Sequence, residues 1–437
     1  MLNKLSKYIE DNDLFDKNDR LLVAVSGGKD SVALVHMLFS LKLSFSIAHC
    51  NFNLRDFESK QDEMFVSFLA KKYDVPFFLK RFASNNFESM KKKSIQMIAR
   101  ELRYKWFYEL LTENNYTKIL TAHHLDDSIE TYLIKKRRNS SIEALRGILP
   151  KNNSVVRPLM CFFSDEILAY IKRNNIIYRE DSSNSSLKYL RNEIRLKSIP
   201  EKELANENYR LEILKEIEFN KIKFERLTKK VNDVRINYFS DFEFGKRLGL
   251  KWIDNTDDNY KDVLYMLLRE YGPFNWKDVF ELLRAKNGKF IENKKNRIIR
   301  ERDCFEISVL KQEKQVTYSV NEHDNILKPL DLIFTHCEVN DVIFKKNTLS
   351  LDLDKLEFPL KLRKWNRGDK FIPLGMRGSK LISDFLINKK CSTLQKENTW
   401  VLFSKQKIAA IIGYQISDEF KLDKNSKFAF KITTKLD

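Results

Sequence analysis

An apolar segment that runs directly into a glycine turn constrains the fold of this chain more than any other feature. The segment Leu21–Val25 has no polar alternation, which is typical of a short strand buried on both faces. Ser-Gly-Gly-Lys-Asp-Ser follows at 26–31 and leads into an apolar run typical of a helix. A strand, a glycine turn and a helix start aim backbone N–H groups at an anion. The sequence therefore predicts an anion site within an α/β fold.

The residues of this turn have the chemistry of a site for a nucleotide and a metal ion. Adjacent glycines let a phosphate approach the backbone, and the serine hydroxyls can donate to its oxygens. A carboxylate would repel phosphates unless a cation such as Mg²⁺ lies between them. We therefore expect Asp30 to bind the metal and the turn to bind the nucleotide through Ser26, Gly27, Gly28, Lys29, Asp30 and Ser31. The alternative is a turn that needs small residues and binds nothing.

Strands and helices alternate through about residue 180. Further strands are expected at 43–49, 75–82 and 118–122, with helices at 56–73, 92–113 and 128–138. The alternation predicts a doubly wound parallel sheet, in which ligand sites gather at the carboxyl ends of the strands. Three polar segments fall at such ends, namely SGGKDS, HCNFNLR (49–55) and HHLDD (123–127).

The rest of the chain predicts two further parts. A polar run at 180–184 continues into a basic helix with Arg191 and Arg195 on one face. Charged residues at 201–245 predict a linker helix, and residues 261–309 predict two helices followed by a hairpin. The pattern is β-rich from about residue 313. We expect three domains, a catalytic α/β domain at 1–212, a small helical and α+β domain at 213–312, and a β-rich domain at 313–437.

Charge and cysteine usage bound the function. The formal net charge of +18 favours a polyanionic partner, most simply a nucleic acid. A lysine-rich proteome is the alternative explanation of that charge. The cysteines are scattered without a Cys-x-x-Cys pair, which argues against a zinc knuckle, an iron–sulfur site or a disulfide framework. No signal peptide or long apolar span is visible, so we expect a cytoplasmic protein without a membrane partner.

The turn at 26–31 resembles the SGGxDS loop of the N-type ATP pyrophosphatases, the PP-loop superfamily. Further segments narrow the resemblance: ARELRY at 99–104, TAHHLDDSIET at 121–131, RPL at 157–159, EDSSN at 180–184, YLRNEIR at 189–195 and a long basic segment at 361–386. As an ordered set with HCNFNLR, these motifs resemble the tRNA(Ile)-lysidine synthetase family.

This resemblance implies an ATP-dependent ligase that joins L-lysine to carbon 2 of the wobble cytidine of an isoleucine tRNA with a CAU anticodon. ATP would adenylate the 2-carbonyl oxygen and release pyrophosphate, and the lysine amine would then attack carbon 2 and expel AMP. The product, lysidine, changes codon reading to AUA and aminoacylation from methionine to isoleucine. ATP and Mg²⁺ are the implied cofactors, and tRNA(Ile) and L-lysine are the implied partners of a monomer or homodimer.

The resemblance also implies a catalytic set, Asp30, Arg103, His123, Asp127 and Arg195. The two arginines match family residues near the nucleotide, and Asp127 and neighbouring carboxylates would hold the cationic lysine. His123 could accept a proton near neutral pH. From the residues alone, two alternatives stay open. The histidine pair could begin a helix whose dipole the following aspartates complement, and Arg103 could lie on a solvated face.

The basic segment is expected to contact the tRNA backbone through Arg363, Lys364, Arg367, Lys370, Arg377 and Lys380. The alternative is a basic turn between strands.

Two departures from the family pattern are Phe52, where the family usually has histidine, and Asn139, where it often has glycine. The rival functions are another PP-loop tRNA-modifying enzyme, such as a thiolase, and a non-catalytic RNA-binding protein.

Overall fold

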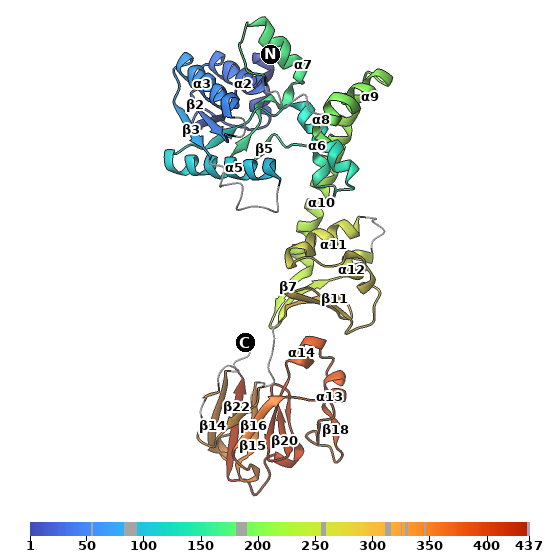
Figure 1. The fold of residues 1–437 in the computed structure, drawn as a ribbon. Helices are drawn as coiled ribbons and strands as arrows, with labels where there is room; N and C mark the ends of the chain where they lie inside the picture. The colour runs from blue at the N-terminus through green and yellow to red at the C-terminus, as the bar shows by residue number, and fades with distance from the viewer. Residues whose placement is uncertain are drawn as a thin grey trace. The chain divides into compact units, whose positions relative to one another are not determined.

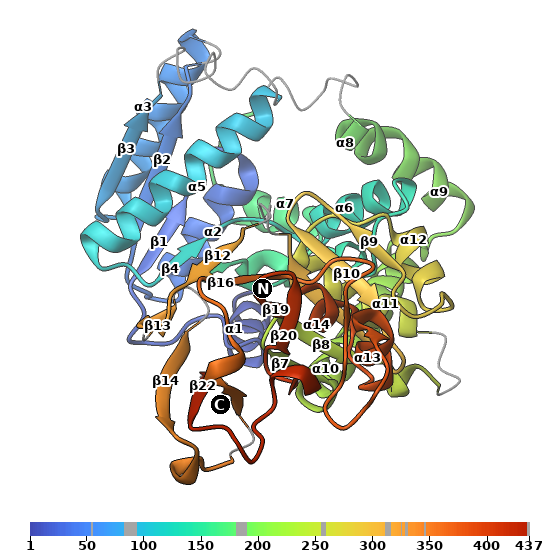
Figure 2. The ribbon, with the colours of Figure 1, turned by 90° about the horizontal axis from the view of Figure 1, so that it is seen from below.

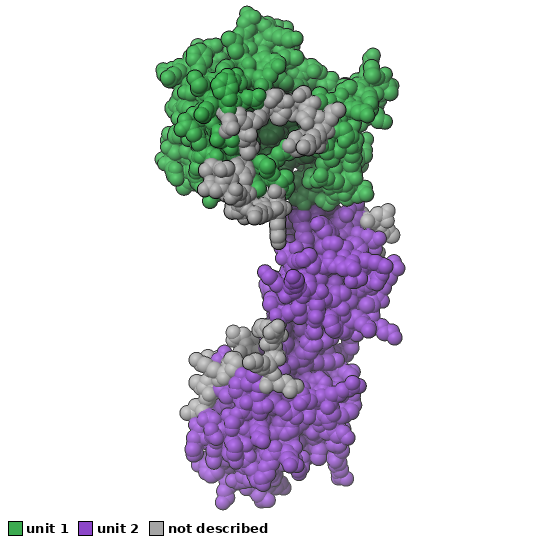
Figure 3. Space-filling view, in the orientation of Figure 1, with its two compact units in different colours: residues 1–226 green, residues 227–437 purple. Residues whose placement is uncertain are grey.

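A computed structural model gives the fold of the chain. It describes residues 1–53, 56–82, 94–180, 190–254, 259–310, 316–324, 326–327, 331–344 and 347–434. The chain forms two compact units, Met1–Arg226 and Leu227–Asp437, which are coloured separately in Figure 3. Within the described residues, no helix is long and apolar enough to cross a membrane. The three-domain division at 212 and 312 stays a prediction.

The first unit is built on a six-stranded sheet in the order β3-β2-β1-β4-β6-β5. Its strands are β1 Leu21–Ala24, β2 Phe45–Asn51, β3 Phe77–Arg81, β4 Lys118–Leu120, β5 Lys151–Asn152 and β6 Val155–Val156. Its helices are α1 Leu2–Asp11, α2 Lys29–Ser40, α3 Asp56–Lys72, α5 Ile95–Asn114, α6 Leu125–Arg137, η1 Ala144–Arg146, η2 Pro158–Cys161, α7 Ser164–Arg173, α8 Leu190–Glu193, η4 Ile194–Ser198, α9 Ile199–Ala205 and α10 Tyr209–Tyr238, which continues into the second unit. All strand pairs except β5–β6 are parallel, which confirms the doubly wound α/β prediction.

Both faces of the sheet are covered, because successive residues of β1 enter different cores. Leu21 and Val23 belong to the core that includes residues of α1, α2, α3 and α7, whereas Leu22 belongs to the core that includes residues of α5. Figure 1 shows α2 and α3 on one side of the sheet and α5 on the other. This burial on both faces explains why the strand has no polar alternation.

The order of the strands reverses direction at β1. β2 and β3 lie on one side of β1, and β4 lies on the other, as Figure 2 shows. Ligands of open α/β sheets bind in the crevice at such a reversal, outside the carboxyl ends of the strands. The glycine turn follows β1 and the HHLDD segment follows β4, so this fold brings the two motifs to the same crevice.

The second unit is made of antiparallel sheets. The first sheet, β7-β8-β11-β10-β9, accompanies helices α11 Tyr260–Leu268 and α12 Trp276–Leu282. Its strands are β7 Phe239–Phe242, β8 Gly245–Gly249, β9 Phe290–Glu292, β10 Asn296–Arg300 and β11 Cys304–Val309. The helix expected through residue 245 ends instead at Tyr238, because β7 and β8 pair with each other and β8 pairs with β11, a strand distant in sequence.

Two more sheets, β12-β16-β19-β20-β21 and β13-β14-β22-β15, share one apolar core. Their strands are β12 Tyr318–Val320, β13 Ile326–Leu327, β14 Leu332–Glu338, β15 Thr348–Asp352, β16 Leu360–Lys364, β19 Trp400–Ser404, β20 Lys407–Ile411, β21 Gln415–Ile416 and β22 Phe428–Thr434. A separate pair, β17 Lys370–Phe371 and β18 Lys380–Leu381, precedes helices α13 Ile382–Asn388 and α14 Thr393–Glu397. The prediction of a β-rich C-terminal region is confirmed.

Candidate active site

The glycine turn forms the expected junction between β1 and α2. Gly27 has a φ of +97°, which residues with a side chain rarely adopt, and Gly28 is the N-cap of α2. The Ser31 hydroxyl donates to the Gly28 carbonyl oxygen at 2.9 Å, and Ser26 Oγ accepts from the Gly28 N–H at 3.3 Å. Among the described residues, no side chain caps this helix, so its first N–H groups are available to an anion.

Lys29 and Asp30 lie on the first turn of α2. Lys29 Nζ donates to Asp30 Oδ1 at 2.8 Å and to Ser164 Oγ at 2.6 Å. Asp30 Oδ2 lies 3.7 Å from Nε2 of His124, which is the residue before α6. Burial would raise the pKa of Asp30, but its contacts with His124 and Lys29 more than offset burial and lower that pKa. Asp30 is therefore ionised at neutral pH.

The first turn of α6 surrounds His124 with carboxylates. The helix begins at Leu125, earlier than the sequence pattern indicated, so Asp126 and Asp127 lie in its first turn. The His124 ring nitrogens lie 3.4 Å from Asp126 and 3.6 Å from Asp127. Burial would lower the pKa of His124, but its close contacts with the carboxylates of Asp126, Asp30 and Asp127 raise it to about 10. His124 is therefore an imidazolium that links the carboxylates of α2 and α6.

Two arginines bind Asp127 and also Glu130, which lies on the next turn of α6. Arg191 donates to Asp127 at 2.9 Å and to Glu130 at 2.6 Å. Arg195 donates to the same two side chains at 3.2 Å and 2.5 Å. The Glu130 side chain is fully buried, whereas those of Arg191 and Arg195 are 42% and 39% exposed. Because Oδ2 of Asp127 also accepts from the backbone N–H of His124 at 3.0 Å, both oxygens of Asp127 have partners.

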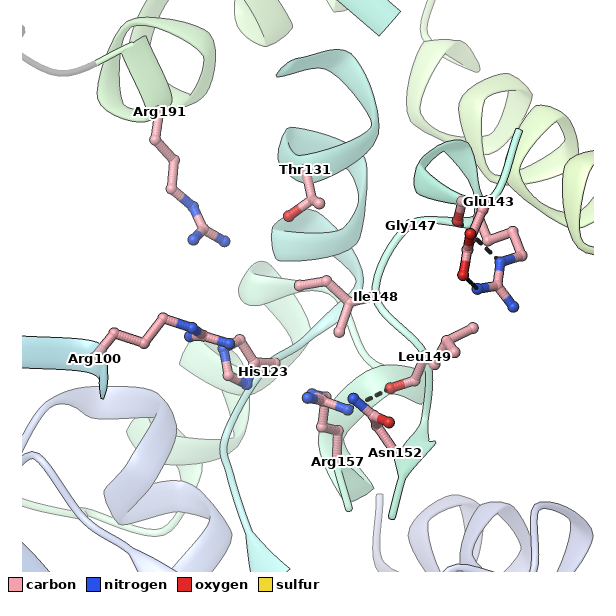
Figure 4. Close-up of a pocket in the computed structure, with 11 residues that line it drawn as sticks. Arg100, His123, Thr131, Glu143, Gly147, Ile148, Leu149, Asn152, Arg157 and Arg191 are labelled. Atoms are coloured by element: carbon pink, nitrogen blue, oxygen red, sulfur yellow. Dashed lines mark hydrogen bonds and ion pairs between the residues drawn. The ribbon is translucent and has the colours of Figure 1, made fainter. Parts of the chain in front are cut away.

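His123 lines a cavity of about 450 Å³ next to this network. Its Nδ1 lies 2.9 Å from Thr121 Oγ1. The cavity is lined in part by charged side chains, Arg100, Glu143, Arg146, Arg157 and Arg191, several of which Figure 4 shows around His123. Burial and the nearby arginines lower the pKa of His123 to about 4, although Asp127 acts in the opposite direction. The His123 ring is therefore neutral and weakly basic near neutral pH, and its role as a proton acceptor stays a prediction.

Comparison with known proteins identifies the family. A model described as a PP-loop domain matches residues 1–202, and one described as a TilS substrate binding domain matches residues 253–311. A tRNA(Ile)-lysidine synthase from Parabacteroides distasonis is 34% identical over 98% of this chain and 98% of its own length. One from Bacteroides thetaiotaomicron is 34% identical over 97% of each. The chain belongs to the tRNA(Ile)-lysidine synthase family.

Solved structures add little to this result. A U34-tRNA thiolase from Methanococcus maripaludis matches with a TM-score of 0.42 and 17% identity, over 49% of this chain and 77% of its own. A structure described as a TILS C-terminal domain matches with a TM-score of 0.25 and 17% identity, over 28% of this chain and 100% of its own. Both scores are too low to carry an argument.

Arg103, one residue of the expected catalytic set, contacts an aromatic pair. Arg103 on α5 places its guanidinium 5.5 Å from the centre of the Phe52 ring, which stacks on Phe82 at 4.8 Å. The phenylalanine at this family histidine position thus belongs to an aromatic pair under Arg103. Leu54 and Arg55 of the neighbouring motif, and residues 181–184 of EDSSN, lie outside the described residues.

Asn139 adopts the conformation for which a glycine is the usual residue. Its φ is +47°, in the left-handed region that asparagine tolerates better than most residues. The N–H groups of Asn139 and Ser140 donate to the carbonyl oxygens of Lys136 and Lys135, both at 3.1 Å. This pair of bonds closes α6 as a Schellman motif. The departure from the family pattern therefore preserves the end of the helix.

The basic segment divides into paired and exposed residues. Arg363 donates twice to Asp369, at 2.8 Å and 2.9 Å, and lies over the Phe403 ring at 4.4 Å. Lys364 donates to Asn398 at 3.0 Å. Three of the expected tRNA contacts are exposed and one is half-buried, namely Arg367, Lys370, Arg377 and Lys380. Arg363 thus has an intramolecular role in the turn that the sequence did not indicate.

The residues around Asp30 fit a magnesium ion that is bound together with phosphates. Among the described residues, no group of three or more His, Cys, Asp or Glu side chains could hold a metal ion. Mg²⁺ typically takes one or two protein carboxylates and completes its shell with water and substrate phosphates. An ionised Asp30 beside a phosphate-binding turn meets that requirement.

Three residues of the site, His124, Glu130 and Arg157, were not predicted from the sequence. Glu130 could have been predicted, because it lies three residues after Asp127 and therefore on the same face of a helix. Arg157 stands in the RPL motif directly after β6. Nothing local marked His124 as the charged member of the histidine pair, since its carboxylate partners come from both α2 and α6.

Proposed function

We propose that this chain ligates L-lysine to carbon 2 of the wobble cytidine of tRNA(Ile) with a CAU anticodon. The observation that carries the proposal is the contact of Asp30 with His124, which joins the phosphate-binding turn to the buried charges of α6 at the sheet reversal. Family membership makes the chain an ATP-using, tRNA-modifying ligase. It acts in the cytoplasm as a monomer or homodimer.

In the first step, ATP adenylates the 2-carbonyl oxygen of cytidine and releases pyrophosphate. An amide-like carbonyl oxygen is a poor leaving group. Adenylation converts this oxygen into part of a good leaving group, AMP. The turn at 26–31 and the N–H groups of α2 bind the phosphates, with Lys29 adding positive charge. Asp30 would hold Mg²⁺, and the ion would supply positive charge for the leaving pyrophosphate. Arg103 contacts the nucleotide from α5.

In the second step, the lysine amine attacks carbon 2 and AMP leaves. Asp127 supplies negative charge for the lysine ammonium, which competes there with Arg191 and Arg195. Arg195 stays bound to the buried Glu130 and faces the nucleotide. His123 offers the cytidine a neutral hydrogen-bonding group, because its low pKa makes it a weak base.

The exposed cations of the second unit supply contacts to the tRNA backbone. Phosphate oxygens suit the exposed and half-buried cations of the basic segment, Arg367, Lys370, Arg377 and Lys380. Arg363 and Lys364 shape the turn that carries these cations.

A PP-loop thiolase is the main rival function. Sulfur transfer there normally uses cysteine pairs, and the cysteines of this chain are free and far apart in sequence.

The test is an incubation of the purified chain with ATP, radiolabelled lysine and a CAU-anticodon tRNA(Ile) transcript. We expect label in a single modified nucleoside after digestion, together with ATP-dependent release of AMP. A transcript with uridine at the wobble position is the matched control and should stay unlabelled. Incorporation of radioactive sulfur without incorporation of lysine would favour the thiolase, and no modification at all would favour the RNA-binding protein.

A substitution separates the role of Asp127 from RNA binding. Asp127→Ala should raise the Michaelis constant for lysine or lower turnover, with little change in tRNA affinity. Loss of tRNA binding with an unchanged lysine dependence would reassign Asp127 to the RNA.

A further inference from the structure

The cavity beside His123 carries more positive charge than its own residues balance. Four arginines and one glutamate are among its lining residues. Two of the arginines have partners, since Arg191 binds the carboxylates of α6, and Arg146 lies 3.8 Å from Glu143 and stacks over the Phe224 ring at 3.9 Å. The other two are Arg100 and Arg157.

Of these two arginines, Arg157 gives the stronger evidence for an anion site. It is only 7% exposed, and its Nη1 donates to the Leu149 carbonyl oxygen at 2.7 Å. Its Nε is buried without a hydrogen-bond partner. Arg100 stacks over Tyr104 at 4.8 Å. Within the described part of the chain, neither guanidinium has a carboxylate at salt-bridge distance.

A buried guanidinium without a counterion is costly, because charges removed from water need compensating partners. Figure 4 shows Arg100 and Arg157 directed toward the space beside His123, with Arg191 reaching in from α8. The low pKa of His123 agrees with a positive potential in this space. The cavity is therefore prepared for an anion that none of the described residues supplies.

We propose that Arg100 and Arg157 bind a backbone phosphodiester of the substrate RNA in this cavity, next to the nucleotide that is modified. The inference rests on the proposed function for the identity of that RNA. Arginine suits the role because its planar fork binds phosphate oxygens bidentately. The cavity volume lies within the range of ordinary ligand pockets.

The RNA, and not the ATP, is the source of this phosphate. No residue of the turn at 26–31 lines the cavity. The two sites are nevertheless neighbours, because His123 lines the cavity and the next residue, His124, contacts Asp30 beside that turn. A phosphodiester here would fix the sugar of the cytidine while its base faces the ATP, as enzymes that act on an unstacked base require.

The experiment measures binding of an anticodon stem-loop RNA with neutral methylphosphonate linkages placed one at a time in the loop. In the wild type, we expect one linkage whose neutralisation weakens binding about tenfold. The unmodified RNA should bind Arg157→Gln about tenfold more weakly than it binds the wild type. Neutralising the sensitive linkage should then cause no further loss of affinity for this variant. The salt slope of RNA binding should fall by about 0.7. The affinity for Mg²⁺-ATP should stay unchanged.

Arg173→Gln is the matched control, because Arg173 is an exposed arginine of α7 in the same unit. It should behave as the wild type. Arg100→Gln is the second test variant, because Arg100 is exposed and its replacement should not affect folding. If Arg157→Gln fails to fold, Arg100→Gln provides the test. Neutralising the sensitive linkage should then weaken RNA binding less in Arg100→Gln than in the wild type.

Three results would overturn the inference. They are an unchanged RNA affinity in a folded variant, a loss of Mg²⁺-ATP affinity alone, and a sensitive linkage that stays sensitive in both variants. Failure of the proposed function gives a different pattern, because the wild type would then form no lysidine while the coupling between arginine and linkage could persist.

Discussion

The charged residues of α6 and those of the basic turn in the second unit are stabilised in different ways. On α6, Asp126, Asp127 and Glu130 are buried, and each contacts at least two positively charged side chains. In the basic turn, one ion pair, Arg363 with Asp369, is partly buried, and most of the remaining cations face solvent.

The difference determines how each region responds to mutation. Buried charges depend on one another, because removing one partner leaves the other uncompensated in a medium that solvates it poorly. Exposed cations are hydrated in the free protein, so each can bind a phosphate independently and each is screened by salt. We therefore expect substitutions on α6 to affect folding and chemistry together, and substitutions of the exposed cations in the turn to affect RNA binding alone.

The largest expected effect is a loss of turnover in Asp30→Asn. At this position an effect on chemistry separates most clearly from an effect on folding. Asp30→Asn should lower turnover on the order of 10³-fold, since a metal ion contributes several kcal/mol to such a step. The midpoint of thermal unfolding should change little, because His124 keeps its other carboxylates. Asp74→Asn, at an exposed aspartate of the same unit, is the control. Normal turnover in Asp30→Asn with bound Mg²⁺-ATP would refute the metal role.

The interdependence of the α6 charges predicts an asymmetry between the two sides of one network. Replacing both Arg191 and Arg195 by Gln leaves Glu130 buried and unpaired, which should cost about 3 kcal/mol of unfolding free energy. Glu130→Gln should cost only about 1 kcal/mol, because the arginines are partly exposed and can be rehydrated. Urea denaturation of the two variants measures both costs. Equal costs would mean that the network is less buried than the structure indicates.

Those parts of the fold that follow from local pattern could be predicted from the sequence. The unalternated Leu21–Val25 indicates a strand buried on both faces, and the glycines after it indicate a tight turn into a helix. The end of the linker helix could not be predicted in this way. Residues 239–249 are compatible with a helix locally, and only pairing with the distant β11 makes them strands.

The electrostatics of the site were less predictable than its position. His123 and His124 are neighbours with the same intrinsic pKa, yet their pKa values lie near 4 and 10. The arginines that surround His123 come from segments far apart in sequence, and the carboxylates around His124 come from two helices. In the basic turn, Asp369 follows Arg363 closely, but only the turn geometry shows that they pair.

His124 gives the α6 network a measurable pH dependence. Its pKa rises from 6.5 in the unfolded chain to about 10 in the folded one, so its stabilisation is fully present below about pH 6.5 and is lost as the pH rises toward 10. The unfolding free energy of the wild type minus that of His124→Gln should therefore fall by about 3 kcal/mol between pH 6 and pH 9. A difference that grows with pH would contradict an imidazolium at this position.

The basic turn should show the smallest effect and the only one confined to RNA. Replacing Arg367, Lys370 and Arg377 together by Gln should weaken tRNA binding about tenfold and lower the salt slope by about 0.7–0.9 for each lost phosphate contact. Stability and Mg²⁺-ATP affinity should not change, because these side chains are exposed. Filter binding from low to moderate salt measures the slope, and an unchanged slope would make the segment a solvated turn.

Arg363→Gln is the matched variant for that experiment, because it changes one charge of the same segment at a paired position. It leaves Asp369, which is 14% exposed, without its partner, and should cost about 1 kcal/mol of unfolding free energy. Its salt slope should stay close to that of the wild type. If Arg363→Gln lowered the slope as much as one exposed cation does, Arg363 would leave Asp369 to bind RNA, and the division of the turn into paired and exposed residues would be wrong.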